Sequence, residues 1–276
     1  RNKMTKPRYL LDRKAFSSLD RFFLVLGLCL LACQAQAWGP QGHRVAGTMT
    51  WDYLSEESRA RVRALIGDES LASASNWADR MRSNPSPYWQ RQAGPYHYVT
   101  VPPGKTYADV GAPGKGDAMT ALAEFRHILR DPAAARVRKQ LALRFSLHII
   151  QDLHQPMHVG NGRDRGGNDI RLRLAGEGTN LHRVWDSAIL AHASLADAQW
   201  LASYGSVEPA LAAQWRNSGP ETWIEESAAL RDRVYPDGDV VDGDYLDSWL
   251  PAVHSRLQAS AVRGAAWLDS VLAGSD

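Results

Sequence analysis

The sequence predicts a mainly α, single-domain fold that carries at most a small β-hairpin. Signals that begin and end helices recur along most of the chain. Only residues 96–101 and 169–174 have the β-branched or alternating pattern of strands. The 276 residues are 44% apolar and 22% charged and contain no repeat or linker-like break, which is typical of one globular domain.

The expected helices follow from capping residues and hydrophobic periodicity. Ser55 is an N-cap residue with Glu56 and Glu57 in the first helical turn, and Gly67 ends that helix. Asp131 followed by Pro132 predicts the start of a long helix that runs to residue 154. Further helices are expected at residues 71–82, 117–129 and 180–192, with four or five more between residues 196 and 272.

Residues 1–37 are predicted to be a signal peptide that is removed on export. A basic segment precedes the apolar run of residues 22–33, and Ala35-Gln36-Ala37 provides a small-x-small cleavage site. The 12 residues of that run are too few for a membrane-spanning helix, which needs about 20. The sequence therefore predicts a secreted or periplasmic domain, residues 38–276, without a stable membrane anchor.

Removal of residues 1–37 changes the charge and the cysteine content of the protein. The full chain has a net charge of +2 and residues 1–37 contribute +5, so residues 38–276 carry −3. This balance leaves no strongly basic surface to indicate nucleic-acid binding by itself. Both cysteines, Cys29 and Cys33, lie in the removed segment, so the stability of the domain must come from core packing, metal ions or both.

Two histidine–aspartate pairs are the strongest chemical signal. His148 and Asp152 fall on the apolar face of the expected long helix, where an aspartate is costly unless it is paired or binds a metal. His182 and Asp186 repeat the spacing on another expected helix. A salt-bridged core pair explains one occurrence, whereas two pairs with His158 between them favour a metal site. Nitrogen and carboxylate ligands without thiolates suit zinc better than manganese or iron.

Three other segments supply groups of the same kind. His43 follows closely on Trp38, the expected new N-terminus, whose amine and carbonyl can chelate a metal. Asp79 lies late in an expected helix, and His97 lies in the extended segment of residues 96–101.

Taken together, six motifs in this order resemble the S1/P1 nuclease family, which comprises zinc-dependent nucleases directed at single strands. The motifs are Trp38-Gly-x-x-Gly-His43, Trp77-Ala-Asp79-x-x-Arg82, His97-Tyr98, His148-x3-Asp152-x-His-Gln-Pro-Met-His158, Gly166-Gly-Asn168 and Thr179-Asn-Leu-His182-x-x-Trp-Asp186.

The resemblance implies a mainly α fold of the phospholipase C/P1 nuclease type around three zinc ions. The first ion would be bound by Asp79, His97, His148 and Asp152. The second would be bound by the amine and carbonyl of Trp38, by His43 and by a bridging Asp152. The third, set slightly apart, would be bound by His158, His182 and Asp186.

The same resemblance implies catalytic roles. A hydroxide oriented by Asp79 would attack phosphorus, and Arg82 would stabilise charge on the phosphoryl oxygens. The third ion would accept charge on the departing 3′ oxygen, which leaves a 5′-phosphate product. Tyr98 would stack on a base, and Asn168 either binds a substrate phosphate or holds the Gly-Gly turn. Family members usually carry an acidic residue where this chain has Thr100, so base recognition is expected to differ.

These features predict a monomeric, secreted zinc-dependent endonuclease that hydrolyses single-stranded DNA and RNA and also acts as a 3′-nucleotidase. Three Zn²⁺ ions would add +6 to the −3 of residues 38–276 and give about +3, focused in the cleft.

Two other functions are weighed. A zinc-dependent phospholipase C acting on phospholipid resembles this family in fold and metal cluster. Such enzymes tend to have Glu where this chain has Asp186, and they lack the Trp-Ala-Asp-x-x-Arg element, so the nuclease is favoured. A non-catalytic zinc-binding protein would need neither Arg82 nor an Asp79 that orients a hydroxide.

The N-terminus has two possible processing routes. Residues 30–33 loosely resemble a lipoprotein signal, in which Cys33 would be lipidated. That route would leave Trp38 in mid-chain, where its peptide nitrogen is a poor ligand because the lone pair is delocalised. We therefore expect cleavage after Ala37.

Overall fold

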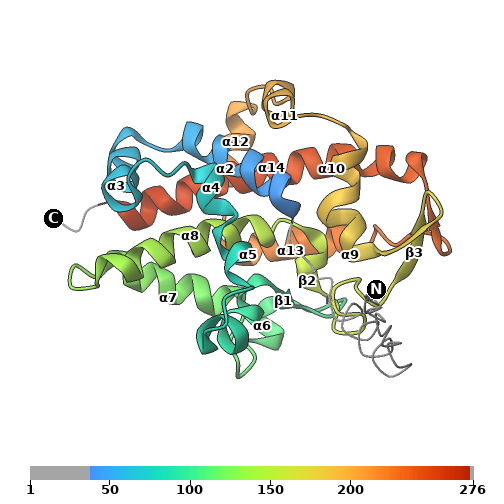
Figure 1. Ribbon diagram of the computed structural model, residues 1–276, viewed down its shortest axis with the longest axis horizontal. Helices are drawn as coiled ribbons and strands as arrows, with labels where there is room; N and C mark the ends of the chain where they lie inside the picture. The colour runs from blue at the N-terminus through green and yellow to red at the C-terminus, as the bar shows by residue number, and fades with distance from the viewer. Residues whose placement is uncertain (1–37, 274–276) are drawn as a thin grey trace, which may run out of the picture. The chain divides into compact units, whose positions relative to one another are not determined.

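Two long helices, α8 (Arg136–Asp152) and α14 (Gly243–Leu272), form the frame of the fold. The structure is a computed structural model that describes residues 38–273. The predicted signal peptide with its two cysteines lies outside the described residues, so the boundary after residue 37 stays a prediction. In Figure 1, α14 runs above α8, and α7 (Ala118–Arg130) lies along the other side of α8.

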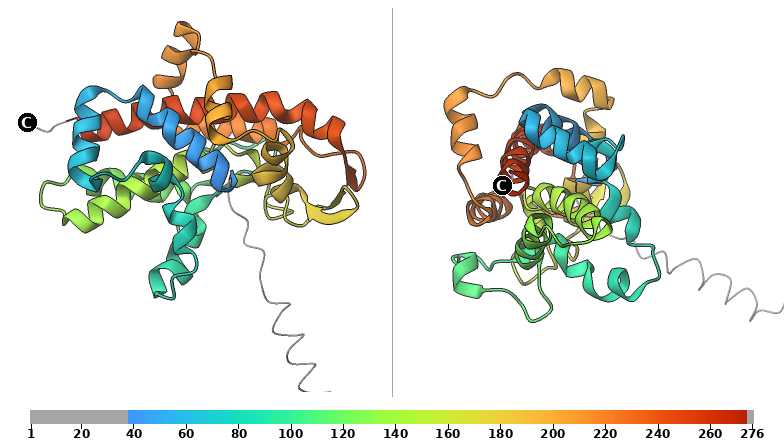
Figure 2. Two further views of the ribbon diagram at one scale, coloured as in Figure 1. Left: turned by 45° about the horizontal axis from the view of Figure 1, so that its top comes forward. Right: turned by 90° about the vertical axis from the view of Figure 1, so that its left-hand side faces the viewer.

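The remaining helical segments pack around this frame. Helix α2 (Gly39–Tyr53) packs against α14 and α4 (Leu71–Ser75). The right-hand view of Figure 2 looks nearly along α14, α8 and α7 and shows them as a bundle. The other segments are α3 (Glu56–Ile66), α5 (Trp77–Met81), η1 (Tyr88–Gln92), η2 (Gly94–His97), α6 (Tyr107–Val110), η3 (Pro156–His158), α9 (Leu181–Arg183), η4 (Val184–Ala188), α10 (Ile189–His192), α11 (Asp197–Ser203), α12 (Pro209–Arg216) and α13 (Pro220–Arg231).

Strands in the described residues are few and short. β1 (Val99–Thr100) pairs in parallel with β2 (Val159–Gly160), which holds the segment after His97 beside the segment after His158. β3 (Arg171–Leu174) forms an antiparallel hairpin with β4 (Glu177–Asn180) and pairs in parallel with β5 (Val240–Val241). The prediction of a mainly α fold is confirmed.

Capping side chains explain several helix starts. Ser55, Asp117 and Asn180 each precede a helix, and each side chain accepts a hydrogen bond from a backbone N–H of the first turn. The helices expected at residues 55–66 and 117–129 are therefore confirmed. The helix expected at residues 180–192 begins at Leu181, after the cap residue Asn180, and residues 184–188 form a π-type turn inside it.

The expected start of the long helix is wrong. Helix α8 begins at Arg136 rather than at Pro132. The Asp131 carboxylate accepts a hydrogen bond from the Ala133 N–H at 2.8 Å and stabilises a turn there. This local bond competes with helix formation, so helical geometry begins one turn later.

Two other expected elements are shorter than the sequence indicated. The helix of residues 71–82 is interrupted at Asn76, whose side-chain amide donates to the Pro40 carbonyl at 3.1 Å. The strand of residues 96–101 is reduced to β1, because residues 94–97 form a 3₁₀ turn that ends at His97.

Aromatic packing between α7 and α8 forms the core beneath the candidate site. The rings of Phe125 and Phe145 lie 5.4 Å apart, and Trp89 stacks on Phe145 at 5.7 Å. The His97 ring lies 5.2 Å from Phe145, so this core reaches the polar centre of the molecule. Within residues 38–273, no helix has both the length and the hydropathy needed to cross a membrane.

Gly47 permits the close approach of α2 to α4. A Cβ at this position would lie 2.3 Å from Ser75 Oγ and 2.5 Å from the Leu71 carbonyl oxygen. We expect Gly47→Ala to lower the free energy of unfolding by ~1–3 kcal/mol, because overpacking forces the backbone to shift.

The matched control is Gly264→Ala in α14, where a Cβ would meet the Thr50 side chain at an ordinary 3.5 Å. Alanine also has the higher helix propensity, so this change should not destabilise the protein. Urea unfolding of both variants measures the difference. Equal stabilities of the two variants would contradict the packing argument.

Candidate metal centre

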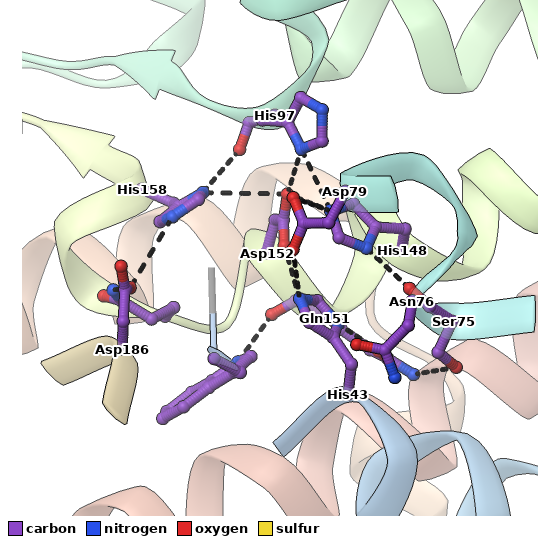
Figure 3. A network of polar contacts seen from close by, with 12 residues as sticks. His43, Ser75, Asn76, Asp79, His97, His148, Gln151, Asp152, His158 and Asp186 are labelled. Carbon is purple, nitrogen blue, oxygen red and sulfur yellow. Dashed lines mark hydrogen bonds and ion pairs between the residues drawn. The ribbon is translucent and has the colours of Figure 1, made fainter. Parts of the chain in front are cut away.

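The last turns of α8 supply the centre of a buried polar cluster (Figure 3). His148 and Asp152, the pair expected from the sequence, face Asp79 from α5 and His43 from α2. His97 approaches from the end of η2. The sequence-predicted ligands on four separate segments therefore meet at one place.

Three groups of side chains lie close enough together to bind a cation. In each group, one possible ligand atom per residue lies within 4.8 Å of the others, and every residue is buried. The groups are His43 with Asp79 and His148, His97 with His148 and Asp152, and His158 with His182 and Asp186.

The two oxygens of Asp152 face different nitrogens. Asp152 Oδ1 lies 3.5 Å from His43 Nε2. Asp152 Oδ2 lies 3.0 Å from His97 Nδ1 and 3.2 Å from His148 Nε2. A carboxylate placed in this way can bridge two cations, which is the role expected for Asp152.

The third group has its own carboxylate. Asp186 Oδ2 lies 3.3 Å from His182 Nε2, and Asp186 Oδ1 lies 3.9 Å from His158 Nε2. The Gln155 side-chain amide donates to Asp186 Oδ1 and fixes the orientation of the carboxylate. This group is linked to the first two, since His158 Nδ1 lies 3.7 Å from Asp152 Oδ2.

Four of the histidines are oriented in the same way. Their Nδ1 atoms lie 2.6–2.7 Å from oxygen acceptors, which are Gln151 Oε1 for His43, Ser75 O for His148, His97 O for His158 and Gly166 O for His182. An oxygen acceptor requires the proton on Nδ1, so in each neutral ring the lone pair of Nε2 faces the cluster. His97 differs, because its Nδ1 faces Asp152.

Gln151 connects several of these segments and is fully buried. Its Oε1 accepts from His43 Nδ1, its Nε2 donates to Ser75 Oγ at 3.1 Å, and its carbonyl accepts from the Trp38 indole at 2.8 Å. Gln151 is not among the site residues expected from the sequence. The signal that was available is its polar side chain on a buried helix, one residue before an expected ligand.

Two glycines bring the loop after β2 against the third group. Gly166 and Gly167 have φ values of 63° and 77°, which favour glycine. A Cβ on Gly166 would lie 2.3 Å from the Met157 carbonyl oxygen. The Asp164 carboxylate accepts from the Gly167 N–H at 2.9 Å and holds the turn. The Gly166 carbonyl can therefore reach His182.

Burial keeps most of the histidines neutral. Loss of hydration lowers the pKa of His43 to about 4, and it lowers the pKa values of His97 and His182 to about 3. Neutral imidazole is the form that binds metal ions. These rings are therefore held in the state that a metal site needs. His148 is the exception: burial lowers its pKa, but Asp152 and Asp79 outweigh burial and raise it.

The three aspartates differ in ionisation. Burial opposes the charge on Asp152, yet His148 and His158 hold its pKa well below the ordinary value. Burial likewise opposes the charge on Asp79, while His148 and the Arg82 guanidinium lower its pKa. Asp186 has a pKa raised well above the ordinary value by burial, with repulsion from Asp79 and Asp152 adding to the effect. A cation beside Asp186 would reverse that shift.

The donor atoms fit a divalent cation. Among residues 38–273, the buried atoms without a hydrogen-bond partner include His43 Nε2, His158 Nε2, His182 Nε2, Asp152 Oδ1 and Asp186 Oδ2. Buried polar atoms are rarely left unsatisfied, and here their lone pairs converge on shared points. Imidazole nitrogens and carboxylate oxygens are ligands that zinc prefers.

Trp38 and Arg82 lie at the edge of this centre. Trp38 is fully buried, and its carbonyl accepts the first hydrogen bond of α2, from the Gly42 N–H at 3.2 Å. Arg82 Nε lies 3.1 Å from Asp79 Oδ1, so the guanidinium borders the first group. The metal-binding role expected for Trp38 and the catalytic role expected for Arg82 stay predictions.

The two expected substrate residues have different surroundings. Tyr98 follows His97 directly and is 47% exposed, so its ring is accessible to a base. The Asn168 side-chain amide donates to the Arg165 carbonyl at 2.9 Å, which favours its role in holding the Gly-Gly turn. Thr100 is exposed on β1.

Comparison with known proteins identifies relatives that are named as nucleases or endonucleases. A family model described as S1/P1 Nuclease matches residues 38–273. Endonuclease 4 of Arabidopsis thaliana is 29% identical, over 92% of this chain and 96% of its own length. Nuclease S1 of Aspergillus oryzae is 25% identical, over 87% of this chain and 94% of its own length. Nuclease P1 of Penicillium citrinum is 28% identical, over 54% of this chain and 57% of its own.

The buried histidines make the metal-free protein sensitive to acid. The pKa of each of five histidines is lowered in the folded state, namely His43, His97, His154, His158 and His182. Below their ordinary pKa of 6.5, the unfolded chain binds protons that the folded chain does not. The raised pKa values of Asp186 and His148 act in the opposite direction, but they involve two groups against five.

We therefore expect the stability of chelator-treated protein to fall as the pH decreases from 6.5 toward 4. Thermal unfolding across this range, at constant ionic strength, measures the effect. A constant or rising Tm on acidification would contradict the assignment of neutral histidines.

Gln151→Ala should weaken metal binding because it removes the acceptor that orients His43. Loss of such a supporting hydrogen bond typically lowers metal affinity by ~10–100-fold. The control is Gln140→Ala on the same helix, whose side chain donates to the Leu65 carbonyl at 2.8 Å. Competition with a chromophoric chelator measures zinc affinity. Similar affinities in the two variants would show that Gln151 has no orienting role.

Proposed function

We propose, because the chain belongs to the S1/P1 nuclease family, that this nuclease hydrolyses single-stranded DNA and RNA to 5′-phosphate products. We also propose that it removes the phosphate of 3′-nucleotides. The observation that carries the proposal is the convergence of eight buried histidines and aspartates in three cation-sized groups. Flexible single strands are the expected substrates, because their phosphates can reach a recessed centre.

The S1/P1 family is generally zinc-dependent, and three ions are proposed for this chain. His97, His148, Asp79 and Asp152 would hold the first. His43, Asp152 and the Trp38 amine and carbonyl would hold the second, and His158, His182 and Asp186 would hold the third. When bound, zinc polarises phosphoryl oxygens and lowers the pKa of water toward neutrality.

The residues around these ions have separate proposed tasks. Asp79 orients the attacking water by accepting a hydrogen bond from it. Arg82, held beside Asp79 at 3.1 Å, donates to the phosphoryl oxygens as their negative charge grows. The exposed ring of Tyr98 stacks on a base next to the cleaved bond. These tasks assign catalysis to Asp79 and Arg82 and substrate binding to Tyr98, with Asn168 supporting the loop.

Export and oligomeric state belong to the same proposal. Residues 1–37 are proposed to direct the chain to the periplasm or the medium and to be removed after Ala37. Removal would give Trp38 the free amine that the second ion needs. The protein is proposed to act as a monomer without a membrane anchor.

A substrate panel tests the proposed activity. Pure protein with zinc is incubated with single-stranded DNA, RNA, a 3′-mononucleotide and phosphatidylcholine, with a chelated sample as control. We expect zinc-dependent cleavage of the first three. Hydrolysis of phosphatidylcholine alone would identify a phospholipase C, and no hydrolysis at all would identify a zinc-binding protein without catalysis.

Arg82→Ala should slow turnover without loss of the metal. Removal of one donor to a developing oxyanion costs about 10²-fold in kcat. Zinc content and Tm should stay close to those of the wild type, because Arg82 is not among the proposed ligands. Arg82→Lys, which keeps the positive charge, serves as the matched variant and should retain more activity. Full activity of Arg82→Ala would refute the proposed role.

One extra residue before Trp38 should remove most of the activity. The added peptide bond delocalises the lone pair of the Trp38 nitrogen, which then makes a poor ligand. Protein that begins at Trp38 is compared with a Met-Trp38 variant for zinc content by elemental analysis and for specific activity. We expect close to three ions in the first and fewer in the second. Equal values in both would show that the N-terminus is not a ligand.

A further inference from the structure

A pocket adjoins the metal centre on the side of Asp79 that faces α2 and α4. Its volume is about 440 Å³, within the range of ~300–1,000 Å³ that is typical of sites for small ligands. The polar side chains in its wall are Arg44, Ser70, Ser73, Asn76, Asp79 and Arg80. None of the tasks proposed above uses this pocket.

The pocket carries positive charge. Arg80 is exposed, and its Nη2 donates to the Ser73 carbonyl at 3.2 Å. No carboxylate of residues 38–273 forms an ion pair with Arg80, whereas Arg44 is paired with Asp197 at 2.6 Å. Glu69, which lies near Ser73, is itself paired with Arg144 at 2.7 Å. Arg80 therefore contributes a positive charge that no carboxylate of the described chain neutralises.

The position of Arg80 relates the pocket to the cleavage centre. Asp79 and Arg82 border the metal groups, while Arg80, one residue after Asp79, lines the pocket. Asn76 fastens the start of α5 to α2 by its hydrogen bond to the Pro40 carbonyl. Asp79 is thus shared by the first cation group and the wall of the pocket, so the two adjoin at this residue.

We infer that this pocket binds the nucleotide next to the cleaved bond, with the Arg80 guanidinium pairing with the phosphate of that nucleotide. The inference rests on the proposed single-strand nuclease function. Guanidinium groups match phosphate in charge and in hydrogen-bond geometry. Ser70 and Ser73 provide hydroxyl groups in the wall of the pocket, and Pro40 and Ala72 provide apolar surface. Such a wall suits a sugar. Arg80 should therefore increase the affinity for strands that extend beyond the cleaved bond, and it should not affect a dinucleotide without terminal phosphates.

The test compares two substrates in the holoenzyme. One is a dinucleotide without terminal phosphates, and the other is a single-stranded oligonucleotide with phosphates on both sides of the cleaved bond. For Arg80→Gln we expect about a tenfold rise in KM for the oligonucleotide, as for loss of one charge-assisted hydrogen bond, and no change for the dinucleotide. The slope of log(1/KM) against log salt should become less steep by about 0.7, the value for one phosphate contact on a single strand.

Arg138→Gln is the matched control. Arg138 is also exposed, and it lies near the start of α8, whereas Asp152 lies at its end. Arg80→Lys, which keeps the charge, should keep most of the salt slope. If Arg80→Gln behaves like Arg138→Gln on both substrates, the pocket assignment is wrong although the nuclease function stands. Equal slowing of both substrates would also overturn it. If the wild type cleaves neither substrate, the proposed function itself fails.

Discussion

The burial of Asp152 is the constraint on which the rest of the structure depends. A carboxylate without solvent exposure is unstable unless positive charge or hydrogen-bond donors compensate it. Asp152 is surrounded by His43, His97 and His148, with His158 slightly farther away. His97 Nδ1 can donate to it at 3.0 Å, and a cation shared with the Nε2 atoms of the other rings would supply the remaining positive charge. These histidines come from four segments of the chain, so compensation of one charge determines how those segments are assembled.

Helix α8 makes this assembly possible because it is long and is buried along its final turns. It presents His148, Gln151 and Asp152 within little more than one turn. His148 and Gln151 reach α4 through Ser75, and Gln151 reaches α2 through His43 and Trp38. Because these contacts join distant segments, a cation bound at the centre would couple its binding to the folding of the domain.

The electrostatics of the site combine neutral nitrogen ligands with a few charges of defined position. Burial removes the charge from most of the histidines, so the carboxylates would supply the negative charge that balances a bound cation. Arg82 and Arg80, two residues apart on and just after α5, add positive charge at the centre and in the neighbouring pocket. A domain with a net negative charge can in this way attract a polyanion to one cleft.

The sequence by itself determined the mainly α class and the set of candidate ligands. Helix caps such as Ser55 and the four-residue spacing of His148 and Asp152 are local patterns, and local patterns are visible in the order of residues. The motifs added Asp79 and His97, which belong to no helical periodicity. The family that these motifs resemble is the family that the comparisons identify.

The tertiary structure alone decided the supporting contacts. The acceptors of His148 and His43 lie 73 and 108 residues away in sequence, so no local pattern indicates Ser75 or Gln151. The break at Asn76 has the same origin, because its side-chain amide donates to the distant Pro40 carbonyl. The late start of α8 is different, since the bond between Asp131 and Ala133 is local and competes with the helix signal of Pro132. Periodicity indicates which face of a helix is buried. Hydrogen-bond partners depend on which distant segments lie beside that helix, and only the folded structure determines that.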